Sequence, residues 1–416
     1  MDAKKTERIL KEHADHTGVL TIAAGLPVHT LDELSDAYTP GVAELSLLIA
    51  KHPELARRYT VSGKLVAVIT DGSAVLGLGN VGPAAGLPIV EGKSLLYREL
   101  AGVNAVPLAL QQGSVEHLVE TIAAISVSFA GIHLEDIAAP TCFAVEEQLR
   151  QRVDVPVYHD DQEGTAIVVL AGLRNAAQVI GKHLEELTVV VNGIGASGYA
   201  TARLLMAAGV RRIIPVDIDG IVTPDTPTAN SYQRSLAADA GSTRSGTLAD
   251  AVHGADAFVG LSVGDVLTGD DVRTMAEDPI VFALANPVQE IAPHEAHAAG
   301  AAVVATGAAS FPNQVNNVLA FPGLFKALLA TGLRQVDLPL QEAVAAGLAA
   351  QVPQPTADHI VPGVFDDGVV DGVVTSVRAF AAERGAGTGS ATSGEDGAPS
   401  NGAAVPEGEA NTSGHE

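Results

Sequence analysis

The chain has 416 residues, with 49 Asp and Glu against 24 Lys and Arg, which gives a formal net charge of −25. This length exceeds the ~250–300 residues at which one hydrophobic core stops growing, so we expect two domains. The acidic balance argues against nucleic acid and membranes as partners, because both attract Lys and Arg patches, and the single cysteine excludes a disulfide framework.

The first 161 residues are expected to form a small α/β domain. They mix short apolar runs with loops rich in Gly, Pro and acids. Periodicity predicts strands over residues 65–70 and 102–110. It predicts helices over residues 53–59, 115–125 and 142–152.

From residue 162 to 384 the pattern changes to a regular alternation of strand and helix. Helices are predicted over residues 165–180, 198–209, 315–330, 339–350 and 374–384. Strands are predicted over residues 188–192, 211–217, 255–263, 278–287 and 301–307. Strands separated by helices indicate a parallel sheet with right-handed crossovers, so we expect a larger α/β domain here.

The apolar stretches and the two ends of the chain bear on its location. The N-terminus has no apolar run typical of a signal peptide, and the most apolar stretches, residues 122–132 and 343–350, are shorter than the ~20 residues that a membrane-spanning helix needs. We therefore expect a cytoplasmic protein. Residues 385–416 contain no Leu, Ile, Met or aromatic residue, which predicts a disordered acidic tail rich in Gly, Ala and Ser.

A glycine-rich motif, GIGASG at residues 193–198, follows the strand predicted over residues 188–192 and opens a helix. This context is typical of a dinucleotide site, where the helix start binds a pyrophosphate and a carboxylate ~20 residues later binds the adenosine ribose. The residues assigned to this site are Gly193, Gly195, Ala196, Ser197, Gly198 and Asp217. The motif predicts a Rossmann-type, doubly wound parallel sheet, with a purely structural Gly-rich turn as the alternative.

The carboxylates near this motif favour NAD over NADP. Asp217 and the nearby Asp219 would repel the 2′-phosphate of NADP. Arg234 or Arg244 could fold toward the site and reverse that preference. The sequence therefore favours NAD but leaves both coenzymes open.

A second match to the motif, GLGNVG at residues 77–82, also follows a strand-like run. The next residues, PAAGLP at 83–88, contain two prolines and are expected not to open a regular helix. We therefore reject this match as a nucleotide loop. Its glycines are expected to allow close backbone packing beside a substrate.

Two pairs of acids, Glu135-Asp136 and Asp160-Asp161, each follow an apolar run and precede a helix-like stretch. Carboxylate oxygens are the ligands that Mg²⁺ and Mn²⁺ prefer. Adjacent acids are equally typical of helix caps and of partners for the helix dipole, so their spacing alone leaves both interpretations open.

Lys93 and Tyr38 are candidate proton-transfer residues. Lys93 stands alone beside a glycine and an apolar stretch, and a desolvated lysine can act as a base. Tyr38 begins the turn-like sequence YTPG, and a phenol can act as an acid. A solvated lysine and a turn with a packed ring are the commoner roles for such residues, so the residues alone do not decide either assignment.

Taken together, these segments closely resemble the malic enzyme family, in particular its short bacterial form. Seven matching segments stand in the family's order and span residues 36 to 325: AYTPGVAELS, TDGSAVLGLGNVGPAAGLPIVEGKSLLY, LEDIAAP, VYHDDQEGTA, VNGIGASGYA, ALANPVQE and FPNQVNNVLAFPG. Such a series of blocks is far more specific than the glycine motif alone.

The resemblance implies oxidative decarboxylation of L-malate to pyruvate and CO₂, with reduction of NAD or NADP and with Mg²⁺ or Mn²⁺ bound. It implies a homodimer or larger homo-oligomer whose metal site lies between the two domains. It assigns these roles: Tyr38 as general acid, Lys93 as general base and substrate contact, Glu135, Asp136 and Asp161 as metal ligands, Asp160 as a supporting catalytic acid, Asn317 as a substrate contact, and Asn286 as a contact to substrate and nicotinamide.

Two features keep alternatives open. Larger family members bind the substrate carboxylate with an Arg in the segment after the Asp71-Gly72 dipeptide, but here that segment reads SAV. Backbone N–H groups of residues 77–82, or Asn286 and Asn317, are the candidates to replace it. The family also contains malolactic enzymes, which release lactate, and a non-catalytic NAD-binding regulator is the alternative outside enzymes.

Overall fold

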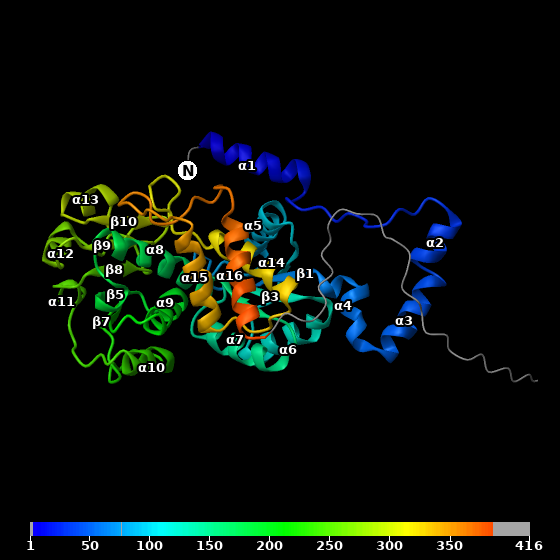
Figure 1. Ribbon diagram of the computed structural model, residues 1–416, viewed down its shortest axis with the longest axis horizontal. Helices are drawn as coiled ribbons and strands as arrows, with labels where there is room; N and C mark the ends of the chain where they lie inside the picture. The colour runs from blue at the N-terminus through cyan, green and yellow to red at the C-terminus, as the bar shows by residue number, and fades with distance from the viewer. Residues whose placement is uncertain (1–2, 76, 386–416) are drawn as a thin grey trace, which may run out of the picture.

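A computed structural model describes residues 3–75 and 77–385, so the predicted tail, except for Gly385, lies outside the described residues. The body contains two separate sheets, each covered by helices, and an N-terminal segment projects from it (Figure 1). The predicted α/β class, with the larger domain built on a Rossmann-type doubly wound sheet, is confirmed.

The first sheet has four parallel strands in the order β2-β1-β3-β4. The strands are β1 (Leu65–Thr70), β2 (Asn104–Ala109), β3 (Gly131–Glu135) and β4 (Val157–His159). The prediction for β1 is confirmed, whereas β3 and β4 were not among the predicted strands. Because neighbouring parallel strands end at the same edge of a sheet, the residues that follow β3 and β4 lie side by side.

The second sheet has six strands in the order β10-β9-β8-β5-β6-β7, all parallel except β7. The strands are β5 (Thr188–Asn192), β6 (Arg212–Asp217), β7 (Gly220–Ile221), β8 (Ala257–Gly260), β9 (Ile280–Ala283) and β10 (Val303–Thr306). The strand order reverses beside β5, since β6 lies on one side of it and β8 on the other. Doubly wound sheets bind dinucleotides at such a point, and the GIGASG loop follows β5.

Helices cover both sheets. Those of the first part of the chain are α5 (Pro83–Ala101), α6 (Val115–Ile125) and α7 (Thr141–Arg152). Those of the second part are α8 (Thr165–Val179), α9 (Ala196–Ala207), α10 (Ser231–Asp239), α11 (Leu248–Val252), α12 (Gly269–Thr274), α13 (Pro293–Ala298), α14 (Phe321–Thr331), α15 (Leu338–Ala350) and α16 (Val369–Glu383). Within residues 3–75 and 77–385, no helix has the length and apolar content needed to cross a bilayer.

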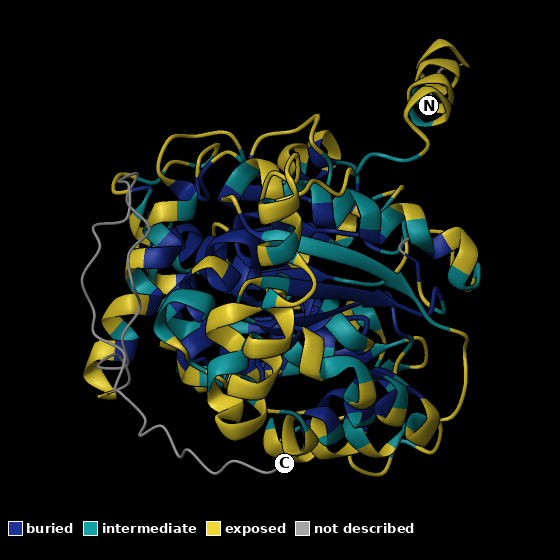
Figure 2. Ribbon diagram, turned by 90° about the vertical axis from the view of Figure 1, so that its right-hand side faces the viewer, coloured by how far each residue is buried: buried dark blue, intermediate teal, exposed yellow. Residues whose placement is uncertain are grey.

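Helix α14 returns from the second part of the chain to the first sheet. Its Phe321 and Phe325 meet Tyr97 of α5 edge to face, with ring centroids 4.8 and 5.5 Å apart. One buried cluster therefore runs continuously from the first sheet to the second, and Figure 2 shows this interior as a dark band through the body. This shared core packs α14 against α5 beside the ends of β3 and β4.

Helix α5 contradicts the expectation that residues 83–88 cannot open a helix. It begins at Pro83 and runs for 19 residues through Pro88. A proline at the first helical position needs no hydrogen bond for its missing N–H, and Pro88 removes only one bond further on. Burial of Val90 and Tyr97 against the sheet outweighs that loss. The rejection of the GLGNVG loop as a nucleotide site stays a prediction.

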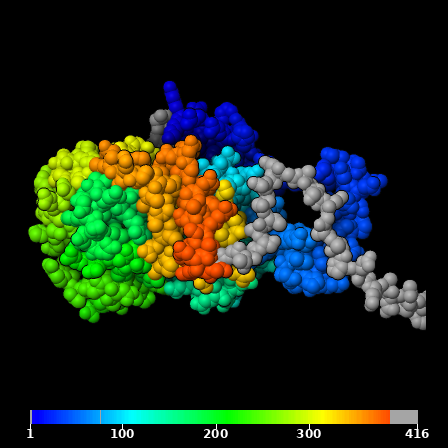
Figure 3. Space-filling model, viewed as in Figure 1, coloured from blue at the N-terminus to red at the C-terminus, as the bar shows by residue number. Residues whose placement is uncertain are grey.

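Residues 3–61, here called the arm, carry apolar surface that their own chain leaves uncovered. The arm contains α1 (Ala3–His16), α2 (Leu31–Ala37), α3 (Gly41–Lys51) and α4 (Ala56–Tyr59). None of its residues is buried, and α2 and α3 stand apart from both sheets (Figures 1 and 3). Its exposed large apolar side chains are Leu10, Ile22, Leu26, Val28, Leu31, Leu34, Tyr38, Val42, Leu47, Leu48, Tyr59 and Val61.

Candidate active site and coenzyme site

The two predicted acid pairs meet at the carboxyl edge of the first sheet. Glu135 is the last residue of β3, and Asp160 and Asp161 follow β4 in a π-helical turn. Asp136 has a left-handed backbone with φ of +55°, which redirects the chain straight after the strand. Carboxylate oxygens of Glu135, Asp136 and Asp161, here called the acid cluster, lie within 4.8 Å of one another.

The acid cluster has the chemistry of a divalent-cation site. The Asp136 N–H donates to Asp161 Oδ2 at 2.8 Å, while Asp136 Oδ2 is buried with no hydrogen-bond partner among the described residues. An orphaned buried carboxylate oxygen beside two further carboxylates is costly unless a cation satisfies it. Three oxygen donors fit Mg²⁺ or Mn²⁺, with substrate and water completing the coordination.

The cation-free protein is expected to lose stability as pH rises. Burial is the main cause that raises the pKa of Glu135 to about 7, of Asp136 to about 8 and of Asp161 to about 6. Because these groups bind protons more tightly when folded, their contribution to stability is complete below about pH 4 and is lost as pH rises through about 6 to 8.

Calorimetry without metal should therefore show a Tm that falls between about pH 5 and about pH 8.5. Added Mn²⁺ should raise Tm mainly at the upper end, where protons no longer compete for the carboxylates. Asp136→Asn should flatten the metal-free profile. A metal-free Tm that instead rises between about pH 5 and about pH 8.5, and that rises more in the parent than in Asp136→Asn, would contradict the shared burial of these acids.

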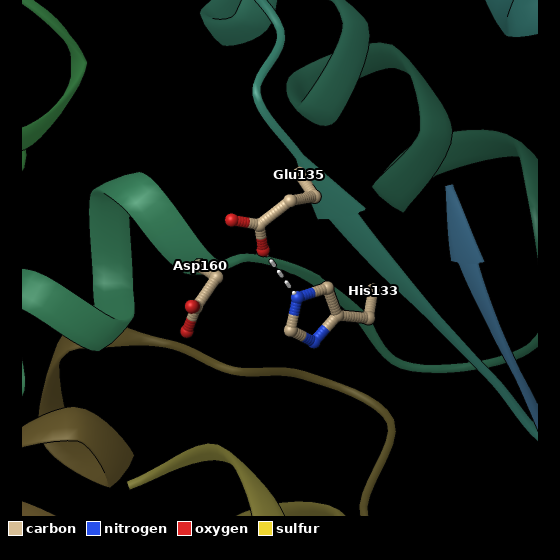
Figure 4. A group of neighbouring side chains, drawn as sticks. All are labelled: His133, Glu135 and Asp160. Atoms are coloured by element: carbon tan, nitrogen blue, oxygen red, sulfur yellow. Dashed lines mark hydrogen bonds and ion pairs between the residues drawn. The ribbon is translucent and has the colours of Figure 1, made fainter. Parts of the chain in front are cut away.

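Lys93 lies beside the acid cluster, and its ammonium group contacts a second group of potential metal ligands. His133, Glu135 and Asp160 also place ligand atoms within 4.8 Å of one another (Figure 4). Lys93 Nζ lies 3.2 Å from Glu135 Oε2 and forms an ion pair with Asp160 Oδ2. Burial would lower the pKa of Lys93, but the charges of Asp160 and Glu135 outweigh it and hold that pKa above its usual value. The ammonium group thus serves as the cation of this second group.

Asp160 holds Lys93 in place and is itself fixed by further hydrogen bonds. Its Oδ1 accepts from the Tyr158 hydroxyl at 2.6 Å, and its Oδ2 accepts from Asn317 Nδ2 at 3.2 Å. Burial opposes ionisation of Asp160, yet Lys93, with smaller contributions from His133 and the Tyr158 hydroxyl, keeps its pKa below the usual value. Asn317 also accepts from Thr165 Oγ1 at 3.2 Å, so the predicted substrate contact is brought to the site by α8 and the turn before α14.

Asn286 lies at the second glycine loop. A Cβ on Gly77, whose φ is +74°, would lie 3.1 Å from the Asn286 carbonyl oxygen, so the loop packs directly on this residue. The Asn286 side chain donates to the Leu284 carbonyl at 3.3 Å. The close packing expected of this loop is therefore present, and contact with a substrate stays a prediction.

The GIGASG loop has the geometry of a dinucleotide site. Gly193 has φ of +95°, and a Cβ there would lie 2.6 Å from the Leu261 carbonyl oxygen. Gly195 is exposed with open space in front of it, directly before the start of α9 at Ala196. An anion can therefore approach the unpaired N–H groups of the helix start.

Asp217 ends β6 with its carboxylate held in place. Its Oδ2 accepts from Gln233 Nε2 at 2.5 Å and its Oδ1 from the Ile218 N–H at 3.0 Å. Gln233 also donates to the Ile194 carbonyl inside the glycine loop at 3.0 Å, so one amide ties the loop to Asp217. Arg234, which could have favoured NADP, donates instead to the Ala229 carbonyl.

Tyr38 does not join the other predicted residues within this chain. It lies at the end of α2 with 68% of its surface exposed. Figure 1 shows α2 far from α5 and β3, which carry Lys93 and Glu135. The arm therefore leaves the site described here without its predicted acid.

Sequence reasoning missed three buried polar residues around Lys93: Tyr97, His133 and Tyr158. All three are 0% exposed. The Tyr97 hydroxyl lies 2.9 Å from His133 Nδ1, and burial lowers the pKa of His133 to about 4. A polar residue inside the apolar run of β3, two positions before Glu135, was the signal for His133.

Comparison with known proteins gives consistent matches over most of the chain. The malic enzyme N-terminal domain matches residues 21–150, and the malic enzyme NAD binding domain matches residues 162–367. The NAD-dependent malic enzyme of Geobacillus stearothermophilus is 44% identical, over 86% of this chain and 76% of its own length. The bifunctional malic/malolactic enzyme of Bacillus subtilis is 43% identical, over 91% and 93%. The NADP-dependent malic enzyme of Halomonas elongata is 40% identical, over 92% and 95%.

Solved structures agree with these matches. The malic enzyme from Pyrococcus horikoshii superposes with a TM-score of 0.87 at 39% identity, covering 92% of this chain and 93% of that one. The NAD-dependent malic enzyme from Thermotoga maritima gives 0.86 at 39% identity, covering 91% and 99%. The chain thus belongs to the malic enzyme family and is an NAD- or NADP-dependent enzyme of that family.

Proposed function

We propose that this enzyme oxidatively decarboxylates L-malate to pyruvate and CO₂ with Lys93 as its general base. The position of Lys93 carries this proposal: its ammonium group contacts Asp160 and Glu135, and Glu135 also belongs to the acid cluster. A proton acceptor and a cation site that share one carboxylate can act on the same substrate oxygen.

The acid cluster would hold Mg²⁺ or Mn²⁺, which when bound supplies Lewis acidity toward the C2 oxygen of malate. Lys93 accepts the proton of the C2 hydroxyl on Nζ. Because Glu135 and Asp160 hold Lys93 protonated, it becomes a base only when the charge of these carboxylates is compensated. Asp160, anchored by Asn317, keeps Nζ in one place during that transfer.

The coenzyme is expected to lie along the GIGASG loop, with its pyrophosphate at the start of α9 and its adenosine ribose at Asp217. Asn286 and Asn317 would orient the substrate, with Asn286 also at the nicotinamide that accepts the C2 hydride. The fixed carboxylate of Asp217 supports NAD as the preferred coenzyme, because it would repel a 2′-phosphate.

The acid that protonates C3 of the enol product is Tyr38, supplied by a second copy in a homodimer or larger homo-oligomer. The two tyrosines within the site are already engaged, Tyr97 by His133 and Tyr158 by Asp160. The exposed Tyr38 lies instead on an arm without buried residues, and the arm's apolar side chains gain stability by packing on another copy.

The boundary between the two domains falls after residue 161, inside the π-helical turn that carries Asp161. Lys93 and the acid cluster then precede the boundary, and Asn286 and Asn317 follow it. This division supports a site between two domains that close on the substrate. A cytoplasmic location stays a prediction.

A malate assay with Mn²⁺, run in parallel with NAD and NADP, tests the proposal. We expect reduced coenzyme and pyruvate in equal amounts, with NAD the better coenzyme. Lactate without reduced coenzyme would instead assign the malolactic reaction, a second candidate favoured by the name of the Bacillus subtilis relative. Coenzyme binding without turnover would contradict both and indicate a regulator.

A further inference from the structure

His133 makes two hydrogen bonds from the middle of a fully buried strand. Its Nε2 lies 2.9 Å from Glu135 Oε2, and its Nδ1 lies 2.9 Å from the Tyr97 hydroxyl. The ring is 0% exposed and meets Phe321 and Tyr158 edge to face, with ring centroids 5.5 and 5.3 Å apart. A hydrocarbon side chain would fill this space with no polar atoms to satisfy, so packing alone does not require a histidine.

The direction of the two hydrogen bonds that link Tyr97, His133 and Glu135 follows from the chemistry of the groups at the two ends. An ionised Glu135 carboxylate can only accept, so His133 Nε2 carries the proton and donates it. Nδ1 of the neutral ring is then an acceptor, and the Tyr97 hydroxyl donates to it. A single tautomer of His133 therefore satisfies both hydrogen bonds, the one from Tyr97 and the one to Glu135.

These hydrogen bonds from Tyr97 through His133 to Glu135 fix which oxygen of Glu135 faces the cation. Both His133 and Lys93 contact Oε2 of this carboxylate, at 2.9 and 3.2 Å. Figure 4 shows the other oxygen of Glu135 turned away from the His133 ring. Oε2 is thus committed to the lysine side of the site, and Oε1 is left for the acid cluster.

We propose that His133, held in one tautomer by Tyr97, is a positioning residue that orients Glu135 so that one oxygen binds the divalent cation while the other holds Lys93. This inference rests on the proposed function for its cation. Outer partners of metal ligands change metal affinity by about 10- to 100-fold when they are lost. His133 thereby couples the geometry of the cation site to that of the general base.

The test is Mn²⁺ affinity of the full-length chain, measured calorimetrically without substrate or coenzyme. His133→Phe should raise the Kd for Mn²⁺ by about 10- to 100-fold. His133→Gln, whose amide nitrogen can still donate to Glu135, should stay within about 3-fold of the parent. Tyr97→Phe removes one oxygen only and should raise the Kd by about 3- to 10-fold, since the tautomer is no longer held.

Phe325→Leu is the matched control, because Phe325 packs against His133 but makes no hydrogen bond to it. Its Mn²⁺ affinity should equal that of the parent, and NAD affinity should be unchanged in every variant if folding is intact. At saturating Mn²⁺ His133→Phe should regain most of its kcat, which separates a positioning role from a catalytic one.

Three outcomes overturn the inference: an unchanged Mn²⁺ Kd in His133→Phe, a loss in Phe325→Leu as large as in His133→Phe, or an unchanged Kd in Tyr97→Phe where His133→Phe fails to fold. If the parent binds Mn²⁺ but does not oxidise malate, the proposed function fails while the affinity ratios still decide the role of His133. If the parent binds no Mn²⁺, both fail together.

Discussion

Replacement of Lys93 by alanine is expected to lower kcat for malate oxidation by about 10²- to 10⁴-fold, the usual contribution of a positioned base. Among the described residues, no other lysine or histidine forms an ion pair with Asp160, and we expect no neighbour to replace Lys93 fully as the proton acceptor. Coupled absorbance and pyruvate measurements at saturating malate, NAD and Mn²⁺ would report the loss. NAD affinity should stay at the parental value, because the coenzyme loop lies on the other sheet.

Two controls separate lost basicity from lost charge balance. Removing Lys93 leaves Glu135 and Asp160 buried without their cation, which is itself destabilising. The double variant Lys93→Ala/Asp160→Asn removes one unpaired charge and should be as inactive as the single variant. Small primary amines added to Lys93→Ala should restore part of the rate. A Lys93→Ala enzyme within about 5-fold of parental kcat would show that another group is the base.

The second large effect is expected when Tyr38→Phe and Lys93→Ala subunits are combined in one dimer. Each variant alone should be nearly inactive in malate turnover. If Tyr38 acts on the neighbouring copy, the mixed dimer contains one site with both residues intact. Mixed dimers purified through two different affinity tags should therefore recover about half of the parental activity per dimer.

The reciprocal mixture is the control. A dimer of one parental subunit and one Tyr38→Phe/Lys93→Ala subunit carries the same two substitutions, yet under arm exchange each of its sites has one defect. It should be nearly inactive. Half-activity in this control, with inactive dimers in the first mixture, would place Tyr38 in the site of its own chain and contradict the exchange.

The second sheet illustrates what could be predicted from local sequence. Its strand, glycine loop and helix occupy consecutive residues, so the hydrogen bonds and the anion-binding N–H groups depend on neighbours only a few positions away. Asp217 was found by the same logic because it ends the next strand. The acid pairs were predicted to hold a cation only through the family resemblance, because spacing alone could not separate that role from helix capping, and the role stays a prediction.

Other features were missed because distant residues decide them. Helix α5 continues through Pro88 because burial of its side chains against β1 and β2 outweighs the lost hydrogen bond. The amide of Gln233 binds both the glycine loop and Asp217, which its sequence neighbourhood shows only as a helix cap. The role of His133 depends on Tyr97, which stands 36 residues earlier in the chain.

The sequence by itself determined the fold class, because strands, helices and the glycine motif follow from short-range periodicity and residue chemistry. The candidate site residues came from the resemblance to the malic enzyme family, and their roles stay predictions. Only the tertiary structure decided how these residues act together. Lys93 and Asp160 stand 67 residues apart and meet because α5, which carries Lys93, packs against the first sheet, at whose carboxyl edge Asp160 follows β4. Tyr38 stays outside because its arm buries none of its residues in its own chain. Contacts of this kind depend on packing over long loops, which no local pattern encodes.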